Sequence, residues 1–468
     1  MSRAVHGLAV LACVAALNLS AARAAEPAEA KPLYADDPAV VKMLEGLGEH
    51  QSLRLPAFKV TGVGIDKDPY FAKRGPSGRD YGNKMAYAPD RGTAMYAGAN
   101  HGAPSRLNDC WEFHLGSNTW IRLAVGDGGD HGRVYRARRA IGAAERLEKA
   151  GKPVDEKTKK AADDATAFMR KWYTDHVVLK DGYLQTKVNG GPVSPWHTWD
   201  GLAYDRTAKR LFWAVLDPDK AMQGKVRAYA RWTDQDAAEL LKQLKPGSSL
   251  YGFDPTEGRW FRQIGPGPHP YLRGMGGSLV YVPEWKKTVW YCAAQNVSPN
   301  DFAMWAYDST TNRWEDLKPN GGTPIRTLVH GRKIAPGGEV QMAYSPKHRK
   351  IVAVQGKGTF VYDIDKNAWS AAGTEEGHHA HDAVTIFYYD AANDLFLFLN
   401  SPKGHWGNPR ELRAFNLATK KWDTLPINGP DINKRPYHRM TGYYDPRFNV
   451  FVVYDSGAKV WVYRVNGK

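Results

Sequence analysis

Side chains that can transfer protons and neutralise a carboxylate gather in the short segments that separate groups of predicted β-strands. Tyr437, His438 and Arg439 are consecutive in one such segment, and His197 and Arg273 lie in two others. Tyrosine and histidine can take up or deliver a proton, and arginine can stabilise a carboxylate whose neighbouring carbon loses one. These five residues are the candidate catalytic groups for a lyase or epimerase acting on uronic acids.

Further histidines and tryptophans in equivalent segments are candidate ligand contacts. Most of the 15 histidines fall in these segments. The candidate ligand-binding residues are His131, Trp196, His330, His378, His381, His405 and Trp406. The tryptophan rings could stack on sugar faces. A structural interpretation stands beside this one, because a histidine just before a strand can also hydrogen-bond to a neighbouring sheet, and His197, His381 and His438 fit that role.

The segment His378-His379-x-His381-Asp382 contains residue types that bind zinc or copper. Adjacent residues of a strand point to opposite faces, so at most two of these ligands converge. We therefore expect no metal or other cofactor.

The elements that must position these residues are β-strands. Between Gln341 and Trp369 the sequence predicts three short strands, at Val340–Tyr344, Ile351–Val354 and Thr359–Asp363, and a fourth that opens with Trp369. The runs are β-branched or aromatic and are separated by Gly, Pro, Asn and Lys, which is the pattern of successive hairpins. Such a sheet needs neighbouring sheets to bury both of its faces.

One spacing recurs along the chain. An aromatic residue, a polar residue, five further residues and a tryptophan follow one another at Phe113–Trp120, Phe253–Trp260, Tyr307–Trp314, Tyr362–Trp369 and Phe415–Trp422. Each copy is preceded by a strand that ends in tyrosine, at Tyr87, Tyr204, Tyr281, Tyr344 and Tyr389, and a sixth copy begins at Tyr444. Self-similarity at roughly 40 residues, with four strands per unit, indicates a β-propeller.

The stretch GANHGAPSRLNDCWEFHLGSNTW, from Gly98 to Trp120, resembles a kelch repeat, and the similarity extends from about Met85 to the C-terminus. This resemblance implies an all-β fold, a six-bladed kelch-type β-propeller like the central domain of galactose oxidase. The shortened sixth copy implies closure by an N-terminal strand, and Leu53–Val60 resembles the fourth strands of the other copies. Joining the two ends would remove an exposed sheet edge.

Three further parts complete the expected organisation. Residues 1–24 resemble a secretory signal peptide, with an apolar run followed by Ala22-Arg23-Ala24, and residues 25–52 form a leader with a short helix at Asp37–Glu45. Residues 53–468 form the propeller. Helical insertions are expected at about 135–173 and 233–244, on one face of it, where they could form a lid or bind a partner protein.

Charge and cysteine content bear on the partner and the compartment. The chain carries a net charge of +15, or +13 without Arg3 and Arg23 of the predicted signal peptide. A basic exported protein favours an acidic glycan as its partner, whereas no motif favours nucleic acid and no segment is apolar enough to span a membrane. We expect a secreted or periplasmic protein. Cys110 and Cys292 fall in non-adjacent repeats, so we expect no disulfide between them.

The segments between the predicted blades surround the mouth of the propeller's central channel. The predicted function is binding or processing of carbohydrate at this channel mouth, with acidic polysaccharide as the preferred ligand. The alternative is a non-catalytic scaffold that binds protein through the helical insertions. The resemblance also implies a sugar mutarotase, or copper chemistry like that of galactose oxidase with Tyr437 and His438 as metal ligands. The copper reaction further requires a cysteine bonded to a tyrosine, and neither Cys110 nor Cys292 lies at the entrance of an inner strand.

Overall fold

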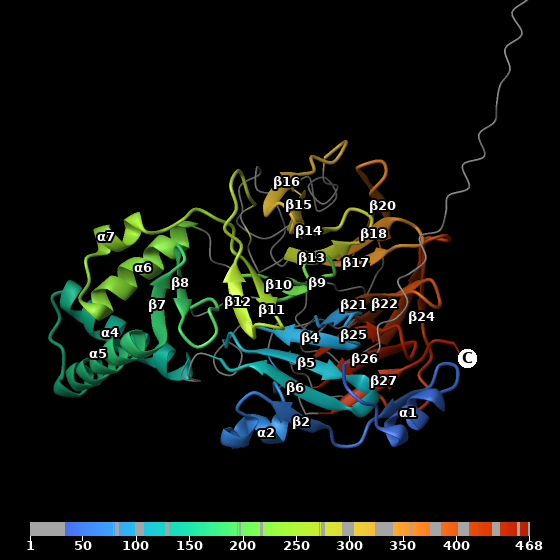
Figure 1. Cartoon of the computed structure of the whole chain (residues 1–468), viewed down its shortest axis with the longest axis horizontal. Helices are drawn as coiled ribbons and strands as arrows, with labels where there is room; N and C mark the ends of the chain where they lie inside the picture. Colours follow the sequence, from blue (N-terminus) through green and yellow to red (C-terminus); the bar gives the residue numbers. More distant parts are fainter. Residues whose placement is uncertain are drawn as a thin grey trace, which may run out of the picture.

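The computed structural model describes residues 33–466 except 78, 80–83, 99–106, 127–130, 194, 196–197, 216–218, 271, 273–276, 293–303, 323–339, 356–357, 375–384, 401–410, 433–439 and 456–458. Within these residues the strands form seven separate sheets, and nearly all strands pair antiparallel with a sequence neighbour (Figure 1). The predicted predominance of β-structure is confirmed. The predicted signal peptide lies outside the described residues.

Six sheets contain four or five strands, and each is named here by the strand that begins its run of consecutive antiparallel strands, which is called its first strand. The β3 sheet contains β3 (Ala86–Ala88), β4 (Thr93–Ala97), β5 (Cys110–His114), β6 (Thr119–Ala124) and the parallel strand β2 (Lys59–Gly62). The β9 sheet contains β9 (Leu202–Asp205), β10 (Arg210–Ala214), β11 (Leu250–Asp254) and β12 (Arg259–Arg262). The β13 sheet contains β13 (Gly277–Val282), β14 (Lys287–Cys292), β15 (Met304–Asp308) and β16 (Arg313–Asp316).

The remaining sheets follow in chain order. The β17 sheet contains β17 (Val340–Ser345), β18 (Lys350–Gln355), β19 (Gly358–Asp363) and β20 (Ala368–Thr374). The β21 sheet contains β21 (Ile386–Asp390), β22 (Leu395–Asn400), β23 (Glu411–Asn416) and β24 (Lys421–Thr424). The β25 sheet contains β25 (Thr441–Asp445), β26 (Val450–Tyr454), β27 (Val460–Tyr463) and β1 (Ser52–Arg54). A separate hairpin pairs β7 (Val177–Lys180) with β8 (Tyr183–Thr186).

The recurring tryptophan spacing is explained by hairpin geometry. In all five copies the aromatic residue and the tryptophan seven positions later are direct cross-strand partners, as Tyr362 and Trp369 are in the β17 sheet. Their ring centroids lie 5.0 to 5.2 Å apart. Such aromatic pairs each contribute about 0.5–1.5 kcal/mol beyond area burial. The turns use residues that tolerate positive φ, such as Asn118, Asn312 and Asn367.

The predicted membership of the kelch family, with its likeness to galactose oxidase, is wrong. The sheets are seven separate units and none closes on itself. Spacing misled the prediction because this interval follows from the loop length and register of a hairpin, which proteins of unrelated families can share. Asn108, Asp109 and Trp111, which carried the resemblance, have structural roles: Asp109 accepts hydrogen bonds from Arg79 at 2.8 and 2.6 Å and from the indole of Trp111 at 2.7 Å.

The N-terminal strand predicted at 53–60 is divided between two sheets. β1 pairs antiparallel with β27, in the register Ser52↔Tyr463 to Arg54↔Trp461. The chain then leaves the β25 sheet, and β2 pairs parallel with β6 of the β3 sheet. Pro56 follows Leu55 at this point, and proline cannot donate to a strand ladder. The N-terminal segment therefore ties two sheets together.

The first strands of the six larger sheets contact one another in a cyclic order. β3 contacts β9, β9 contacts β13, β13 contacts β17, β17 contacts β21, β21 contacts β25, and β25 contacts β3. Their residues are mostly buried, as in β17 and β25, where all positions are. These strands therefore define the centre of the β-structure.

The helices are α1 (Pro38–Glu45), η1 (Ile65–Lys67), α2 (Pro69–Arg74), η2 (Leu115–Ser117), α4 (His131–Lys149), α5 (Glu156–His176), α6 (Asp219–Thr233) and α7 (Ala237–Lys242). α1 begins as predicted, with the Asp37 carboxylate accepting the amide of Ala39 at 3.0 Å. Helices α4 to α7 lie together with β7 and β8 to one side of the other sheets (Figure 1). The insertion expected at 233–244 contains only the short α7, and α6 precedes it.

Candidate functional site

The residues predicted to bind or react with a ligand lie outside the described part of the chain. This holds for the candidate catalytic residues Tyr437, His438, Arg439, His197 and Arg273, and for the ligand-binding candidates Trp196, His330, His378, His381, His405 and Trp406. His131 begins helix α4, and nothing of its side chain is described. The mutual arrangement of these residues therefore stays a prediction, and the described site is built from other residues.

A cavity of about 180 Å³ lies where the first strands of five sheets meet. β3, β9, β13, β17 and β21 all contribute to its wall. Six tyrosines line it: Tyr87, Tyr204, Tyr281, Tyr344, Tyr388 and Tyr389. Its one lining lysine is Lys84, and Arg206 is its arginine. The wall thus combines aromatic side chains with two cationic residues that flank strands.

Lys84 is the central residue of a buried network of hydrogen bonds beside this cavity. Its ammonium group donates to Asp200 Oδ2 at 3.1 Å, to the carbonyl of Leu279 at 2.7 Å and to the carbonyl of Met342 at 3.4 Å. An ammonium group has three N–H donors, so these three acceptors use all of them. The acceptors belong to three different sheets or the segments that lead into them. Lys84 therefore holds the sheets together and has no donor left for a ligand.

Asp200 is the charged partner of Lys84 and is buried with it. The hydroxyl of Ser278 and the amide of Met342 also donate to its Oδ2 atom, the latter at 3.3 Å. Burial raises the pKa of Asp200, while the positive charge of Lys84 opposes this rise. A buried ion pair is favoured when further hydrogen bonds satisfy its remaining capacity, and Ser278 and Met342 supply two such bonds to Asp200 Oδ2.

The neighbouring residue Met85 extends the network to the last two sheets. Tyr388 of β21 donates its hydroxyl to the carbonyl of Met85 at 2.6 Å, and the amide of Met85 donates to the carbonyl of Gly442 at 2.9 Å. Burial, together with the charge of Asp200, raises the pKa of Tyr388. Lys84 and Met85 therefore connect all six first strands through side-chain and backbone bonds.

Three of the tyrosines that end first strands, Tyr281, Tyr344 and Tyr444, hydrogen-bond to the preceding sheet in the cycle. Tyr281 shares a hydrogen bond with Thr207 at 2.7 Å, and Tyr344 donates to Glu284. Similarly, Tyr444 accepts the amide of Ala392 at 3.4 Å. In each case the partner belongs to the end of the preceding first strand or to the turn after it. The strand-ending tyrosine found in the sequence is thus a contact between sheets.

These tyrosines are not poised as bases. Burial raises the pKa of Tyr204, Tyr281, Tyr344 and Tyr389, and the carboxylates beside Tyr204 and Tyr344 raise it further. The phenols therefore stay protonated at neutral pH. The described wall can bind a ligand through ring faces, but it offers no group suited to proton abstraction.

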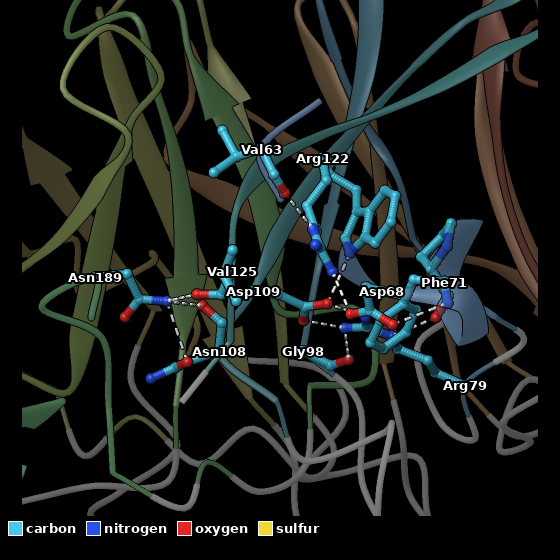
Figure 2. Close-up of polar contacts among 12 residues, drawn as sticks. Val63, Asp68, Phe71, Arg79, Gly98, Asn108, Asp109, Arg122, Val125 and Asn189 are labelled. Carbon is cyan, nitrogen blue, oxygen red and sulfur yellow. Dashed lines mark hydrogen bonds and ion pairs between the residues drawn. The ribbon is translucent and has the colours of Figure 1, made fainter. Parts of the chain in front are cut away.

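A second polar network joins the β3 sheet to its neighbours (Figure 2). The amide group of Asn189 donates to the carbonyl of Asn108 at 2.8 Å and to that of Val125 at 2.9 Å. Arg122 donates to Asp68 and to the carbonyl of Val63, both at 2.7 Å. Because these polar groups are bonded to one another, the network is structural and adds no reactive group.

Sequence reasoning missed the two central residues of the site, Lys84 and Asp200. Both precede a first strand by two residues, as Lys84 does β3 and Asp200 does β9. That position was recognised as important for histidine and arginine, but 116 residues separate the two in the chain, and no local pattern links them. Among the described residues no group of three or more histidine, cysteine or carboxylate side chains could hold a metal ion.

No known family model matches the chain. Over 159 residues it is 23% identical to the N-(sulfonatooxy)prop-2-enimidothioate sulfolyase of Thlaspi arvense, a match that covers 33% of this chain and 44% of that protein. The chain therefore spans less than half the length of this relative. A match of this extent does not assign the chain to a family.

The chain is similar to solved structures that include the following two. An auxiliary nutrient binding protein from Bacteroides ovatus has a TM-score of 0.43 at 7% identity, covering 89% of this chain and 77% of that one. The GH74 enzyme of Niastella koreensis has a TM-score of 0.39 at 12% identity, covering 84% and 44%. Neither is described as a kelch protein or a galactose oxidase. At these scores the similarity assigns neither fold nor function.

No helix in the described residues is both long and apolar enough to cross a membrane. The longest helices, α4 and α5, are rich in charged residues along their exposed sides. The expected export of the protein rests on the predicted signal peptide, which remains a prediction.

Proposed function

We propose that this chain is an exported carbohydrate-binding protein whose ligand is an acidic polysaccharide. The observation that carries the proposal is the tyrosine-lined cavity at the meeting point of five first strands. Aromatic side chains with a few fixed polar groups are the usual lining of small-molecule sites. The net charge of +15 supports an anionic rather than a neutral ligand.

The size of the cavity supports binding of one sugar ring. Its volume of about 180 Å³ is below the roughly 300–1,000 Å³ of sites for drug-sized ligands. A single ring at the end of a chain suits this volume better than a longer stretch does. The bonded state of Lys84 and the protonated phenols support recognition rather than catalysis by the described wall.

A cyclic arrangement of six sheets around this cavity, closed by β1, belongs to the same proposal. The cyclic contacts among the first strands, the tyrosine contacts between successive sheets, and the pairing of β1 with β27 support it. In this arrangement the candidate catalytic residues, such as His197, Arg273 and Tyr437, precede first strands in sequence and would contact the ligand from one end of the cavity. A uronate lyase or epimerase reaction by these residues remains the catalytic form of the proposal.

The relative from Thlaspi arvense is named as a lyase whose substrate carries a sulfonatooxy group, which is anionic. An anionic ligand is what the charge of this chain favours as well. The match is too short to transfer the reaction itself.

Calorimetric titration with oligogalacturonate and with its fully methyl-esterified form tests the proposal, because only the first carries free carboxylates. We expect binding of the acidic form. Tyr281→Ala, which removes a half-buried ring from the cavity wall, is expected to weaken this binding about tenfold. Tyr281→Phe keeps the ring and is expected to bind like the wild type.

Tyr70→Ala is the matched control, because Tyr70 is 42% exposed on α2 and does not line the cavity. Thermal unfolding of each variant separates a loss of binding from a loss of fold. No binding of either oligosaccharide by the wild type, or equal affinity of a folded Tyr281→Ala variant, would refute the proposal. If the chain is instead a scaffold, the cavity variants would not change binding of its protein partner, whereas changes in helices α4 to α7 would.

A further inference from the structure

We propose that the exposed face of helix α4 is a second binding surface, for an extended stretch of acidic polysaccharide. The proposal rests on the ligand class of the proposed function and gives that ligand a second site. The face is defined by Arg136, Arg139, Arg146 and Lys149, all of which are exposed. They are spaced by three, seven and three residues, so they share one side of the helix.

The opposite side of α4 determines which way this face points. Val134, Ala137, Ile141 and Ala144 are buried, and α4 packs against α5, whose buried residues include Met169 and Trp172. Of the two acidic residues in the second half of α4, Glu148 falls on the side of the buried residues, and Glu145 lies at the edge of the basic face, one turn before Lys149. Glu145 pairs with Arg231 of α6 at 2.8 Å, which fixes the helix from its flank. The basic face is therefore turned to solvent.

The charges in the N-terminal half of this face are not explained by the stability of the helix, whereas Arg146 and Lys149 lie in the last turn, where the helix dipole favours cations. Arg136 and Arg139 lie in the N-terminal half, where the helix dipole favours acidic residues, and the first turn of α4 contains none. Arg136 with Arg139 and Arg146 with Lys149 are also like-charged pairs three residues apart, which are destabilising. Among the described residues Arg136, Arg146 and Lys149 have no acidic partner.

Helix α5 provides the contrast. Its first turn contains Glu156, and Asp155 caps it. Its exposed Lys160 and Lys171 pair with acidic residues four positions later, at 3.2 and 2.7 Å. Two lysines of α5 are thus neutralised within their own helix, whereas Arg136, Arg146 and Lys149 of α4 have no acidic partner among the described residues, which indicates an external partner for them.

The dimensions and surroundings of the face favour a linear polyanion. Thirteen residues separate Arg136 and Lys149, and at about 1.5 Å per residue the face is about 20 Å long. A membrane-bound helix would also need exposed apolar residues to insert. The described exposed large hydrophobic residues are Leu33, Met43, Val63, Tyr70 and Val188, and none of these lies on α4.

The test compares two triple variants that each remove three positive charges. Arg136→Gln/Arg146→Gln/Lys149→Gln changes the basic face, and Lys157→Gln/Lys160→Gln/Lys171→Gln changes exposed lysines of α5. Binding to polygalacturonate is measured over a range of sodium chloride concentrations. We expect the α4 variant to lose about tenfold or more in affinity at low salt. The slope of log affinity against log salt should fall by about two to three, as for cations that release counterions from a polyanion.

The α5 variant is expected to keep the affinity within about twofold and the slope unchanged. Equal losses in the two variants would overturn the proposal, as would DNA fragments or anionic lipid vesicles that bind the wild type as tightly as polygalacturonate at the same salt concentration. Tyr281→Ala separates this inference from the proposed function. If that cavity variant binds normally while the α4 variant fails, the cavity assignment is wrong and the α4 surface stands.

Discussion

The strongest test of the central network is the removal of the positive charge of Lys84. In Lys84→Met the side chain keeps most of its length but loses its three hydrogen bonds, including the one to Asp200 at 3.1 Å. The Asp200 carboxylate then stays buried with only the hydroxyl of Ser278 and the amide of Met342 as donors. The carbonyl groups of Leu279 and Met342 lose a donor as well.

The expected loss follows from the burial of both partners, whose side chains are 7% and 4% exposed. Breaking a buried ion pair by removing one partner typically costs about 3–5 kcal/mol, because a charge is left without compensation. Replacing both partners avoids this penalty. Lys84→Met/Asp200→Asn is therefore expected to recover most of the loss and to lie within about 2 kcal/mol of the wild type.

Urea unfolding at two pH values provides the assay. Burial already raises the pKa of Asp200, and loss of Lys84 raises it further. A carboxyl group whose pKa is higher in the folded state stabilises the fold at low pH, and this contribution is lost as the pH rises through that pKa. The loss in free energy of unfolding of Lys84→Met relative to the wild type should therefore be smaller at pH 5 than at pH 8. A loss below about 1 kcal/mol, or a double variant no more stable than the single one, would refute the reasoning.

Three further predictions concern other parts of the molecule. Burial raises the pKa of Asp445 to about 6 from an ordinary 3.8, so the free energy of unfolding of the wild type falls as the pH rises between these values. Asp445→Asn should make the free energy of unfolding, measured by urea titration, depend less on pH in this range. Parallel curves of unfolding free energy against pH for the wild type and the variant would contradict this. Gly98→Ala should lower the free energy of unfolding by about 2 kcal/mol or more, because φ is +76° and a Cβ would lie 2.6 Å from the Trp213 ring. Gly151→Ala, at φ +65° with open space around it, should lower it less. Thermal unfolding measures both, and equal losses would count against the clash at Gly98. If the lyase prediction holds, polygalacturonate yields an unsaturated, ultraviolet-absorbing product at a rate that Tyr437→Phe lowers about a hundredfold or more, and no product from the wild type would end that prediction.

Some features were predictable because they depend on neighbours in the sequence. The interval from Tyr362 to Trp369 reflects a hairpin whose two rings must face each other, so the strands on either side follow from it. The cap of α1 by Asp37 is equally local. The same local character explains the wrong family assignment, since a hairpin interval describes one turn and not the ancestry of a chain.

Helix α6 and strand β2 show the limit of such reasoning. α6 buries Met222, Val226, Tyr229 and Trp232, but these residues become a helical face only because α5 and α7 pack beside it. β2 has one half-buried residue, and it forms a strand because β6 lies beside it as a parallel partner. Both elements depend on surfaces that distant parts of the chain provide.

The amino-acid sequence alone determined the predominance of β-strands, the aromatic pairs within the sheets and the tyrosine at the end of each first strand, because each depends on residues a few positions apart. Only the tertiary structure decided that Lys84 meets Asp200, that the tyrosines bridge successive sheets around a cavity, and that one face of α4 is left to solvent. The physical reason is range. The energies of buried charges and of solvent exposure depend on which surfaces meet in space, and residues far apart in the chain supply those surfaces.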